Sequence, residues 1–133
     1  MTDATQSGIE AAKAYFDRFV AAFATFDGRN VAELFAPPVV AVRSDGTSIG
    51  LATQDDVIRY YQAALDEYRG KGCVSAQWSD LAVTPMGCAS LLAAVTWQLL
   101  KRDGSVITEW RQSYGLRRID GGEPKAFACA SHG

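Results

Sequence analysis

The dipeptide Asp103-Gly104 lies between two long segments in which apolar and polar residues alternate. An Asp-Gly pair flanked in this way is the strongest short-range signal for a β-hairpin. It predicts two strands, at about residues 88–101 and 106–119, joined by a two-residue turn. In that register Trp97 lies opposite Trp110, and a shift by one residue would move every side chain to the other face. The alternation therefore predicts which side chains point into the protein.

The predicted hairpin has two faces of different character. One face carries aromatic side chains and one amide: Trp97, Trp110, Tyr114 and Gln112. The other face is mixed and carries Thr96, Gln98, Glu109, Arg111 and Ser113. A buried amide needs partners, because each unpaired polar group costs about 1–3 kcal/mol. Gln112 is therefore expected either to bond internally, to backbone or to a tyrosine, or to face a ligand.

A third strand is predicted before this hairpin, at about residues 73–84, with a turn at Met86-Gly87. That turn places Trp78 beside Val95 and brings Asp80 onto the aromatic face. Burial without partners raises the pKa of a carboxyl group, which is one way to obtain a general base or acid. Asp80 is therefore the candidate catalytic residue, unless a bulge or the rim of the sheet lets it reach water.

The first part of the chain has the pattern of helices. Apolar residues recur at intervals of three and four from Ile9 to Phe23, and Ser7 and Glu10 have the spacing of a capping box before them. A short second helix is predicted from Val31 to Phe35, because Pro37-Pro38 cannot continue it.

A brief β-branched segment from Val39 to Arg43 predicts the first strand. Thr53 and Asp56 form a capping box at the start of a third helix, which ends at Gly70-Lys71-Gly72. One more strand is predicted at about residues 125–131. Helices followed by a meander of long antiparallel strands indicate an α+β domain.

The composition limits the class of protein and of partner. The chain is long enough to form one domain with its own core, residues 1–133. A net charge of −2 provides no basic face for phosphates, which argues against a nucleic-acid partner. The stretch from Leu81 to Leu100 alternates as strands do and does not predict a membrane span. Cys73, Cys88 and Cys129 form no CxxC pair, which predicts a reduced, cytoplasmic protein.

The single histidine, His132, leaves no ligand spacing typical of a metal site, and no motif indicates another cofactor. His132 is the penultimate residue, and chain termini are usually exposed. It is expected to be a bystander in solvent, or else to cap the mouth of an internal cavity.

Residues 27–36 read Asp-Gly-Arg-Asn-Val-Ala-Glu-Leu-Phe-Ala before the first strand. They resemble the G-D-x-x-x-x-x-L-F-A of the nuclear transport factor 2-like superfamily, and Gly50 before the capped helix resembles its G-x-x-A-I. The order of elements is also similar over roughly residues 9–131, most of all to the SnoaL-like and ketosteroid isomerase-like branch. The resemblance implies a cone-shaped, curved antiparallel sheet wrapped around three N-terminal helices, a cystatin-like α+β roll.

The catalytic positions of that branch are not preserved. The general base of the ketosteroid isomerases falls on Arg43, which stays protonated, and their oxyanion-hole tyrosine falls near Phe19. Their protonated aspartate falls near Gln112. The limonene epoxide hydrolase-like set needs a second acid beside Asp80, and the scytalone dehydratase-like set needs two histidines. Whether the chain is an enzyme is therefore left open by the sequence.

Three functions are compatible with these residues. The first is a binding protein whose apolar aromatic pocket has a polar end, Arg43 and Gln112, that holds a small hydrophobic or acidic organic molecule. Its walls would be Tyr61, Trp97, Trp110 and Tyr114. The second is an isomerase, cyclase or dehydratase-type enzyme in which Asp80 acts with Arg43 or Gln112. The third is a non-catalytic dimerisation module whose interior is filled by tryptophans.

Arg43 is expected to project into the same cavity as Gln112. A guanidinium in an aromatic interior must be compensated, here either by Asp80 or by an anionic ligand. A homodimer is expected through the mixed face of the sheet, flanked by Leu92, Leu100 and Ile107. Members of the resembled superfamily commonly dimerise in that way.

Overall fold

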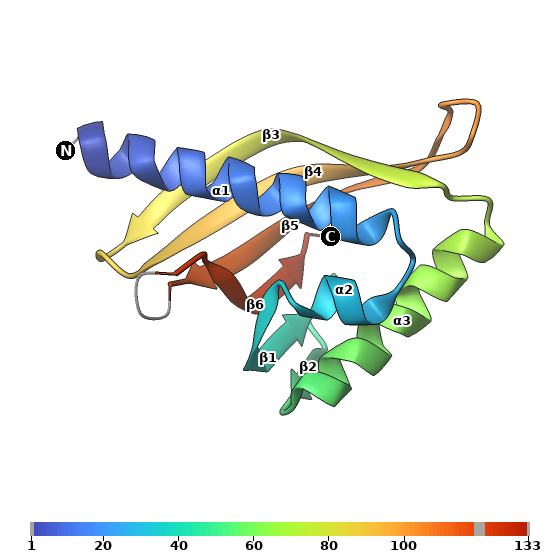
Figure 1. Cartoon of the computed structure of the whole chain (residues 1–133), viewed down its shortest axis with the longest axis horizontal. Coiled ribbons are helices and arrows are strands. Elements are labelled where there is room, and N and C mark those ends of the chain that lie inside the picture. The colour runs from blue at the N-terminus through green and yellow to red at the C-terminus, as the bar shows by residue number, and fades with distance from the viewer. Residues whose placement is uncertain (1, 119–121, 133) are drawn as a thin grey trace.

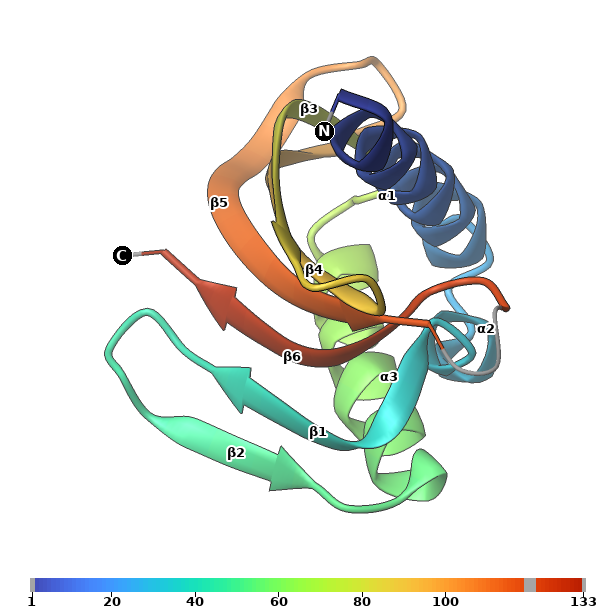
Figure 2. The same ribbon diagram turned by 90° about the vertical axis from the view of Figure 1, so that its left-hand side faces the viewer.

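The structure is a computed structural model that describes residues 2–118 and 122–132. Its elements, in chain order, are α1 (Thr2–Phe23), α2 (Gly28–Ala32), β1 (Phe35–Val42), β2 (Ser48–Leu51), α3 (Gln54–Gly70), β3 (Ser75–Met86), β4 (Ser90–Leu100), β5 (Val106–Arg117) and β6 (Lys125–Ser131). The strands form one curved, unclosed sheet in the order β2-β1-β6-β5-β4-β3, and the helices lie on its inner side (Figures 1 and 2). The predicted α+β class and curved sheet are confirmed.

The sequence predicted an antiparallel sheet, but one pair of strands in it is parallel. β1 and β6 run parallel, with Ala41 opposite Cys129, while the other neighbours are antiparallel. Parallel strands cannot be joined by a tight hairpin and need a long connection. Here most of the chain lies between β1 and β6, which makes the parallel pairing possible. This pair brings the C-terminal strand beside the first and joins the β1–β2 hairpin to the rest of the sheet.

The helix ends follow local hydrogen bonding with one exception. The capping box of α3 is present: Asp56 N donates to Thr53 Oγ1 and Thr53 N to Asp56 Oδ2, both at 3.2 Å. The prediction that α1 starts at Ser7 is wrong, since the helix begins at Thr2. Neither Gly nor Pro lies between Thr2 and Ser7, so nothing in this segment interrupts the helix.

The second helix and the first hairpin also differ from expectation. α2 covers Gly28–Ala32 rather than Val31 to Phe35, because the Asp27 side chain caps it by accepting from Arg29 N at 2.9 Å. β2 pairs with β1, Val39 opposite Leu51, and was not predicted. Its four residues are too few to show an alternating pattern.

The predicted pairing of β4 with β5 is confirmed: Trp97 lies opposite Trp110. The turn itself has three residues rather than two, since Lys101 N donates to Ser105 O at 2.9 Å and Gly104 has a φ of +87°. A register shift between Leu99 and Leu100 compensates for the extra residue. Turn and bulge cancel, so the predicted faces are preserved from Thr108 onward, while Ile107 at the bulge turns to the core.

The predicted register of β3 against β4 is wrong. Trp78 lies opposite Trp97 rather than Val95, a shift of two positions that leaves it on the same face. Between Ser79 and Ala82 the ladder is interrupted, and Asp80 there has a φ of +54° and an exposed side chain. The bulge therefore removes Asp80 from the aromatic face.

The core lies between α1 and the inner side of the sheet. Tyr15 and Phe16 are fully buried, and the Tyr15 hydroxyl donates to Leu34 O at 3.0 Å. Around them the aromatic rings meet edge to face, Phe16 against Trp97 and Tyr114. None of the described helices is long and apolar enough to cross a membrane.

Candidate functional site

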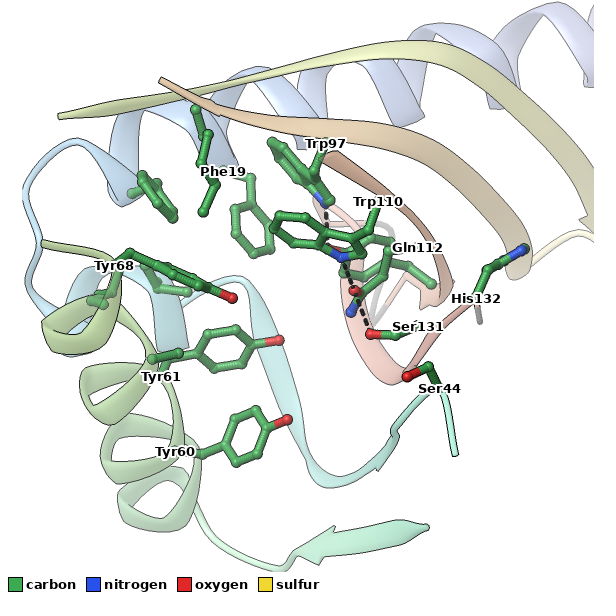
Figure 3. A pocket seen from close by; sticks show the side chains of 17 residues that line it. Phe19, Ser44, Tyr60, Tyr61, Tyr68, Trp97, Trp110, Gln112, Ser131 and His132 are labelled. Atoms are coloured by element: carbon green, nitrogen blue, oxygen red, sulfur yellow. Dashed lines mark hydrogen bonds between the residues drawn. The ribbon is translucent and has the colours of Figure 1, made fainter. Parts of the chain in front are cut away.

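A pocket of about 330 Å³ opens between α3 and the inner side of β4 and β5 (Figure 3). It lies at the end of the cone that α1 does not fill. The sequence analysis expected five of its lining residues: Tyr61, Trp97, Trp110, Gln112 and Tyr114. The pairing of β4 with β5 brings four of these five together, as the alternation predicted.

One face of α3 forms the opposite wall. Tyr61, Ala64 and Tyr68 recur at three and four residues, so they share a side of the helix with the neighbouring Tyr60. In Figure 3 the three tyrosines point from α3 toward the strands. The Tyr61 ring packs on Phe35, with centroids 4.8 Å apart, which holds it in place.

Gln112 is held in one orientation by two hydrogen bonds. Its Oε1 accepts from Trp110 Nε1 at 2.7 Å and from Ser131 Oγ at 3.0 Å (Figure 3). Because an indole N–H can only donate, the atom facing Trp110 must be the amide oxygen. Both lone pairs of that oxygen are then used, which leaves the NH2 group as the donor of this side chain.

The tyrosine hydroxyls around the pocket remain protonated at neutral pH. Burial raises the pKa of Tyr61 and Tyr114 well above the ordinary value, and it raises those of Tyr60 and Tyr68 as well. Tyr114 accepts from Trp97 Nε1 at 2.8 Å, so its own proton is free to be donated. The pocket therefore presents neutral hydroxyl and amide donors.

Cys129 lies beside the pocket without acting as a nucleophile at neutral pH. It is buried, and its Sγ is 3.8 Å from the Tyr61 hydroxyl. Burial raises the pKa of its thiol more than the contacts with Tyr61 and Gln112 lower it. The reactive form of a cysteine is the thiolate, which this environment disfavours.

Arg43 does not project into the pocket, contrary to expectation. β1 ends at Val42, and Arg43 starts the turn to β2, where its N–H donates to Thr47 O at 2.8 Å. The side chain is exposed and is not among the residues that line the pocket, although the next residue, Ser44, is. Burial raises the pKa of Tyr60, and the nearby charge of Arg43 partly offsets that rise.

Asp80 also lies away from the pocket. Its side chain is exposed on the bulge of β3, and its backbone carbonyl accepts from Arg111 Nη1 at 2.9 Å. The described residues contain no salt bridge between Asp80 and Arg43. The predicted catalytic group and the predicted polar end are therefore not brought together.

His132 is exposed at the mouth of the pocket, where its Nε2 lies 2.7 Å from Ser113 Oγ. The described lining of the pocket contains no Asp, Glu, Lys or Arg side chain. Within residues 2–118 and 122–132, no three His, Cys, Asp or Glu side chains are grouped as metal ligands would be.

Sequence analysis missed four polar contributors to the pocket. The helical spacing of Tyr60 and Tyr68 with Tyr61 was a usable signal, but only Tyr61 was named as a wall of the pocket. Ser44 and Ser131 had no local signal, because the β1–β2 turn and the parallel pairing of β6 with β1 bring them there.

Comparison with known proteins agrees with this fold. Residues 9–133 match the model of a family described as NTF2-like protein (DUF6841). No curated protein matches the sequence.

Three solved structures illustrate the likeness. An NTF2-like protein from Novosphingobium aromaticivorans has a TM-score of 0.75 at 12% identity, over 96% of this chain and 82% of that one. An uncharacterised protein with a cystatin-like fold from Caulobacter vibrioides has a TM-score of 0.71 at 19% identity, over 95% and 89%. An NTF2-like protein from Cytophaga hutchinsonii has a TM-score of 0.66 at 12% identity, over 92% and 95%. At such identities the likeness shows the fold alone. Because the family model spans nearly the whole sequence, the chain belongs to the NTF2-like family.

Proposed function

We propose that the pocket binds a small, uncharged organic molecule with a flat cyclic body and one hydrogen-bond acceptor, such as a carbonyl oxygen. The observation that carries this proposal is the state of Gln112. Trp110 and Ser131 occupy its oxygen, while its NH2 group remains a donor beside a pocket lined by protonated tyrosines. The pocket thus has donors to offer and aromatic walls around them.

The absence of charge in the described lining bears on the ligand class. Moving a carboxylate from water into an apolar site without a charged partner costs roughly several kcal/mol, because the ion loses its hydration. Arg43, which the sequence analysis assigned to an acidic ligand, is exposed at the rim. A neutral acceptor needs no such partner, because neutral donors are sufficient to replace its bonds to water.

The volume fits a compound of one or two rings. Ligand pockets span roughly 300–1,000 Å³, and the observed 330 Å³ lies at the lower end. Displacing poorly bound water from aromatic walls favours binding through the hydrophobic effect.

The other functions proposed from the sequence have less support. An enzyme that uses Asp80 with Arg43 or Gln112 would need these side chains to meet at one site. Only Gln112 lines the pocket, while Asp80 and Arg43 are exposed on other parts of the molecule. A dimerisation module with a filled interior is disfavoured by the open pocket. Within the NTF2-like family we also propose that the chain belongs nearest the SnoaL-like and ketosteroid isomerase-like branch, which it resembles in its order of elements.

We also propose that two copies associate through the outer side of β3, β4 and β5. The helices lie on the inner side (Figure 2), so the described helices leave that face uncovered. Gln98 bonds to Gln77 and Glu109 across three strands there, and Leu92 is exposed. Ile107, expected on this face, instead packs against the core. Sedimentation at tens of micromolar should give a dimer, and a species near 14.3 kDa would contradict it.

The three cysteines are free thiols in the structure, which fits the reducing cytoplasm that we propose as the location.

The binding proposal can be tested with three naphthalenes of nearly equal size: 2-acetonaphthone, 2-ethylnaphthalene and 2-naphthoate. They offer a neutral acceptor, no acceptor and a charged acceptor in turn. Calorimetric titration should show 2-acetonaphthone binding about tenfold tighter than the hydrocarbon, since one hydrogen bond contributes about 1.4 kcal/mol. Naphthoate should bind most weakly.

Gln112→Leu should remove the difference between 2-acetonaphthone and 2-ethylnaphthalene while both still bind. The matched control is Gln98→Leu, which changes a glutamine on the outer face and should leave the difference intact. Tightest binding of naphthoate, or an unchanged preference in Gln112→Leu, would overturn the proposal.

A further inference from the structure

A second depression, of about 480 Å³, adjoins the pocket at the C-terminal end of α3. Cys73 and Ile107 line it on the far side. Three residues line both cavities: Tyr68, Leu99 and Trp110. These shared residues therefore form the wall between them.

Two aromatic rings make up most of that wall. The rings of Tyr68 and Trp110 have centroids 6.3 Å apart and planes at 34°, one from α3 and one from β5. Both side chains are half-buried, with one side to each cavity. Leu99 is buried in the strand behind them.

Each ring is held from the side of the first pocket. The Trp110 indole donates to Gln112 Oε1 at 2.7 Å, and the Tyr68 ring stacks on Phe23 with centroids 6.1 Å apart. These contacts keep the rings from rotating into the depression. The wall is thus held by contacts within the protein itself.

We propose that Trp110 and Tyr68 are specificity-determining residues that limit the length of the bound molecule. The inference rests on the binding function proposed above and adds a size rule to it. The wild-type pocket accepts compounds that end at the two rings. Removal of either ring joins the two cavities, and the added apolar surface then favours a longer ligand.

The test uses 6-methoxy-2-acetonaphthone and 6-hexyloxy-2-acetonaphthone, which share the neutral acceptor and differ in chain length. Calorimetric titration of the wild-type protein should show a clear preference for the methoxy compound. In Trp110→Ala, and separately in Tyr68→Ala, the ratio of the two affinities should move by about tenfold or more toward the hexyloxy compound, because several added CH2 groups become buried.

Two control variants separate a missing wall from a general loss of packing. Trp110→Phe keeps a ring in the wall and should keep the wild-type preference. Trp78→Phe changes a tryptophan that lines neither cavity and should do the same. Circular dichroism checks that every variant is folded, and the two alanine variants come from different elements.

The outcomes distinguish the two proposals. If the wild-type protein binds the methoxy compound and both alanine variants keep its preference, the size rule is overturned while the binding function stands. If neither compound binds to any variant, the binding function fails and the size rule fails with it. A preference that shifts equally in Trp110→Phe would also overturn the rule, since the wall would still be present.

Discussion

The two ends of the cone contain similar residues and differ in how these are packed. At the closed end α1 lies across the sheet (Figure 1). Tyr15 and Phe16 of that helix are fully buried. At the open end, Trp110 and the tyrosines of α3 are only partly buried around a pocket (Figure 3). An aromatic-rich interior therefore produces a solid core in one place and a cavity in the other.

The difference comes from the contacts that hold each helix. α1 is held by the rings beneath it, whereas α3 packs on α2 and β1. There, a Cβ on Gly28 would come within 2.7 Å of Ile58 O, so the two helices are in close contact. Because α3 is anchored from the side, its tyrosines do not have to fill the space in front of β5. Polar groups show the same contrast, since the Tyr15 hydroxyl donates to Leu34 O inside the core while Gln112 lines the pocket.

The largest effect is expected at the closed end. Phe16→Ala should lower the free energy of unfolding by about 3–5 kcal/mol, because Phe16 is 0% exposed and its ring contacts Trp97 and Tyr114. Urea denaturation with tryptophan fluorescence measures this. A loss below about 1 kcal/mol would mean that the closed end is as loosely packed as the open one.

The anchoring of α3 is tested by Gly28→Ala. The added methyl group meets backbone atoms of α3 and should lower the free energy of unfolding by about 1–3 kcal/mol. The matched control is Gly50→Ala, since a Cβ there meets nothing within 4 Å. Equal stability of the two variants in thermal denaturation would refute the idea that close helix contact positions α3.

The buried tyrosines predict a loss of stability in alkali. Folding raises the pKa of Tyr15, Tyr61 and Tyr114 well above 10.0, so above pH 10 the unfolded chain releases protons that the folded chain keeps. Stability is complete below that pH and falls as the pH rises. Each such tyrosine contributes about 1.4 kcal/mol per pH unit to the decline.

Urea denaturation between pH 8 and 11 measures the slope. Tyr61→Phe should make the slope of the unfolding free energy against pH shallower by the contribution of one buried tyrosine. Tyr60→Phe should change the slope less, because the hydroxyl of Tyr60 is nearer the rim. Identical slopes for the two variants would show that Tyr61 reaches water, and the open end would then be wider than the structure indicates.

The smallest effect is expected at the open end. Trp110→Ala should lower the free energy of unfolding by about 1 kcal/mol, since Trp110 is half-buried and faces a cavity. A core tryptophan costs roughly 3–5 kcal/mol when truncated. A loss in that range, measured beside Phe16→Ala, would place Trp110 in the core and remove the contrast between the two ends.

Much of the site could be predicted from local patterns. The alternation in β4 and β5 was enough to place Trp97, Trp110, Gln112 and Tyr114 on one face, because side chains alternate with a period of two whatever the turn is. The start of α3 could be predicted from its capping box for a similar reason, since the two partners are three residues apart. Such features depend on neighbours in the chain.

Other features depended on segments that are distant in sequence. Asp80 left the aromatic face through a bulge, and Arg43 moved to the rim because an unpredicted strand, β2, turns the chain after Val42. A single extra residue in a strand reverses the face of every later side chain in that strand, and no local propensity reports it.

Three properties of this protein can be read from its residues alone: the class of fold, the inner face of the main hairpin and the uncharged aromatic character of that face. Tertiary packing was needed to show that this face encloses a cavity and that Gln112 is oriented by Ser131 of β6. Hydrophobic patterning specifies which side chains leave water, with an energy set by area. Whether they then touch each other depends on how the helices are held, and that is set by contacts such as Gly28 against Ile58, far apart in the chain.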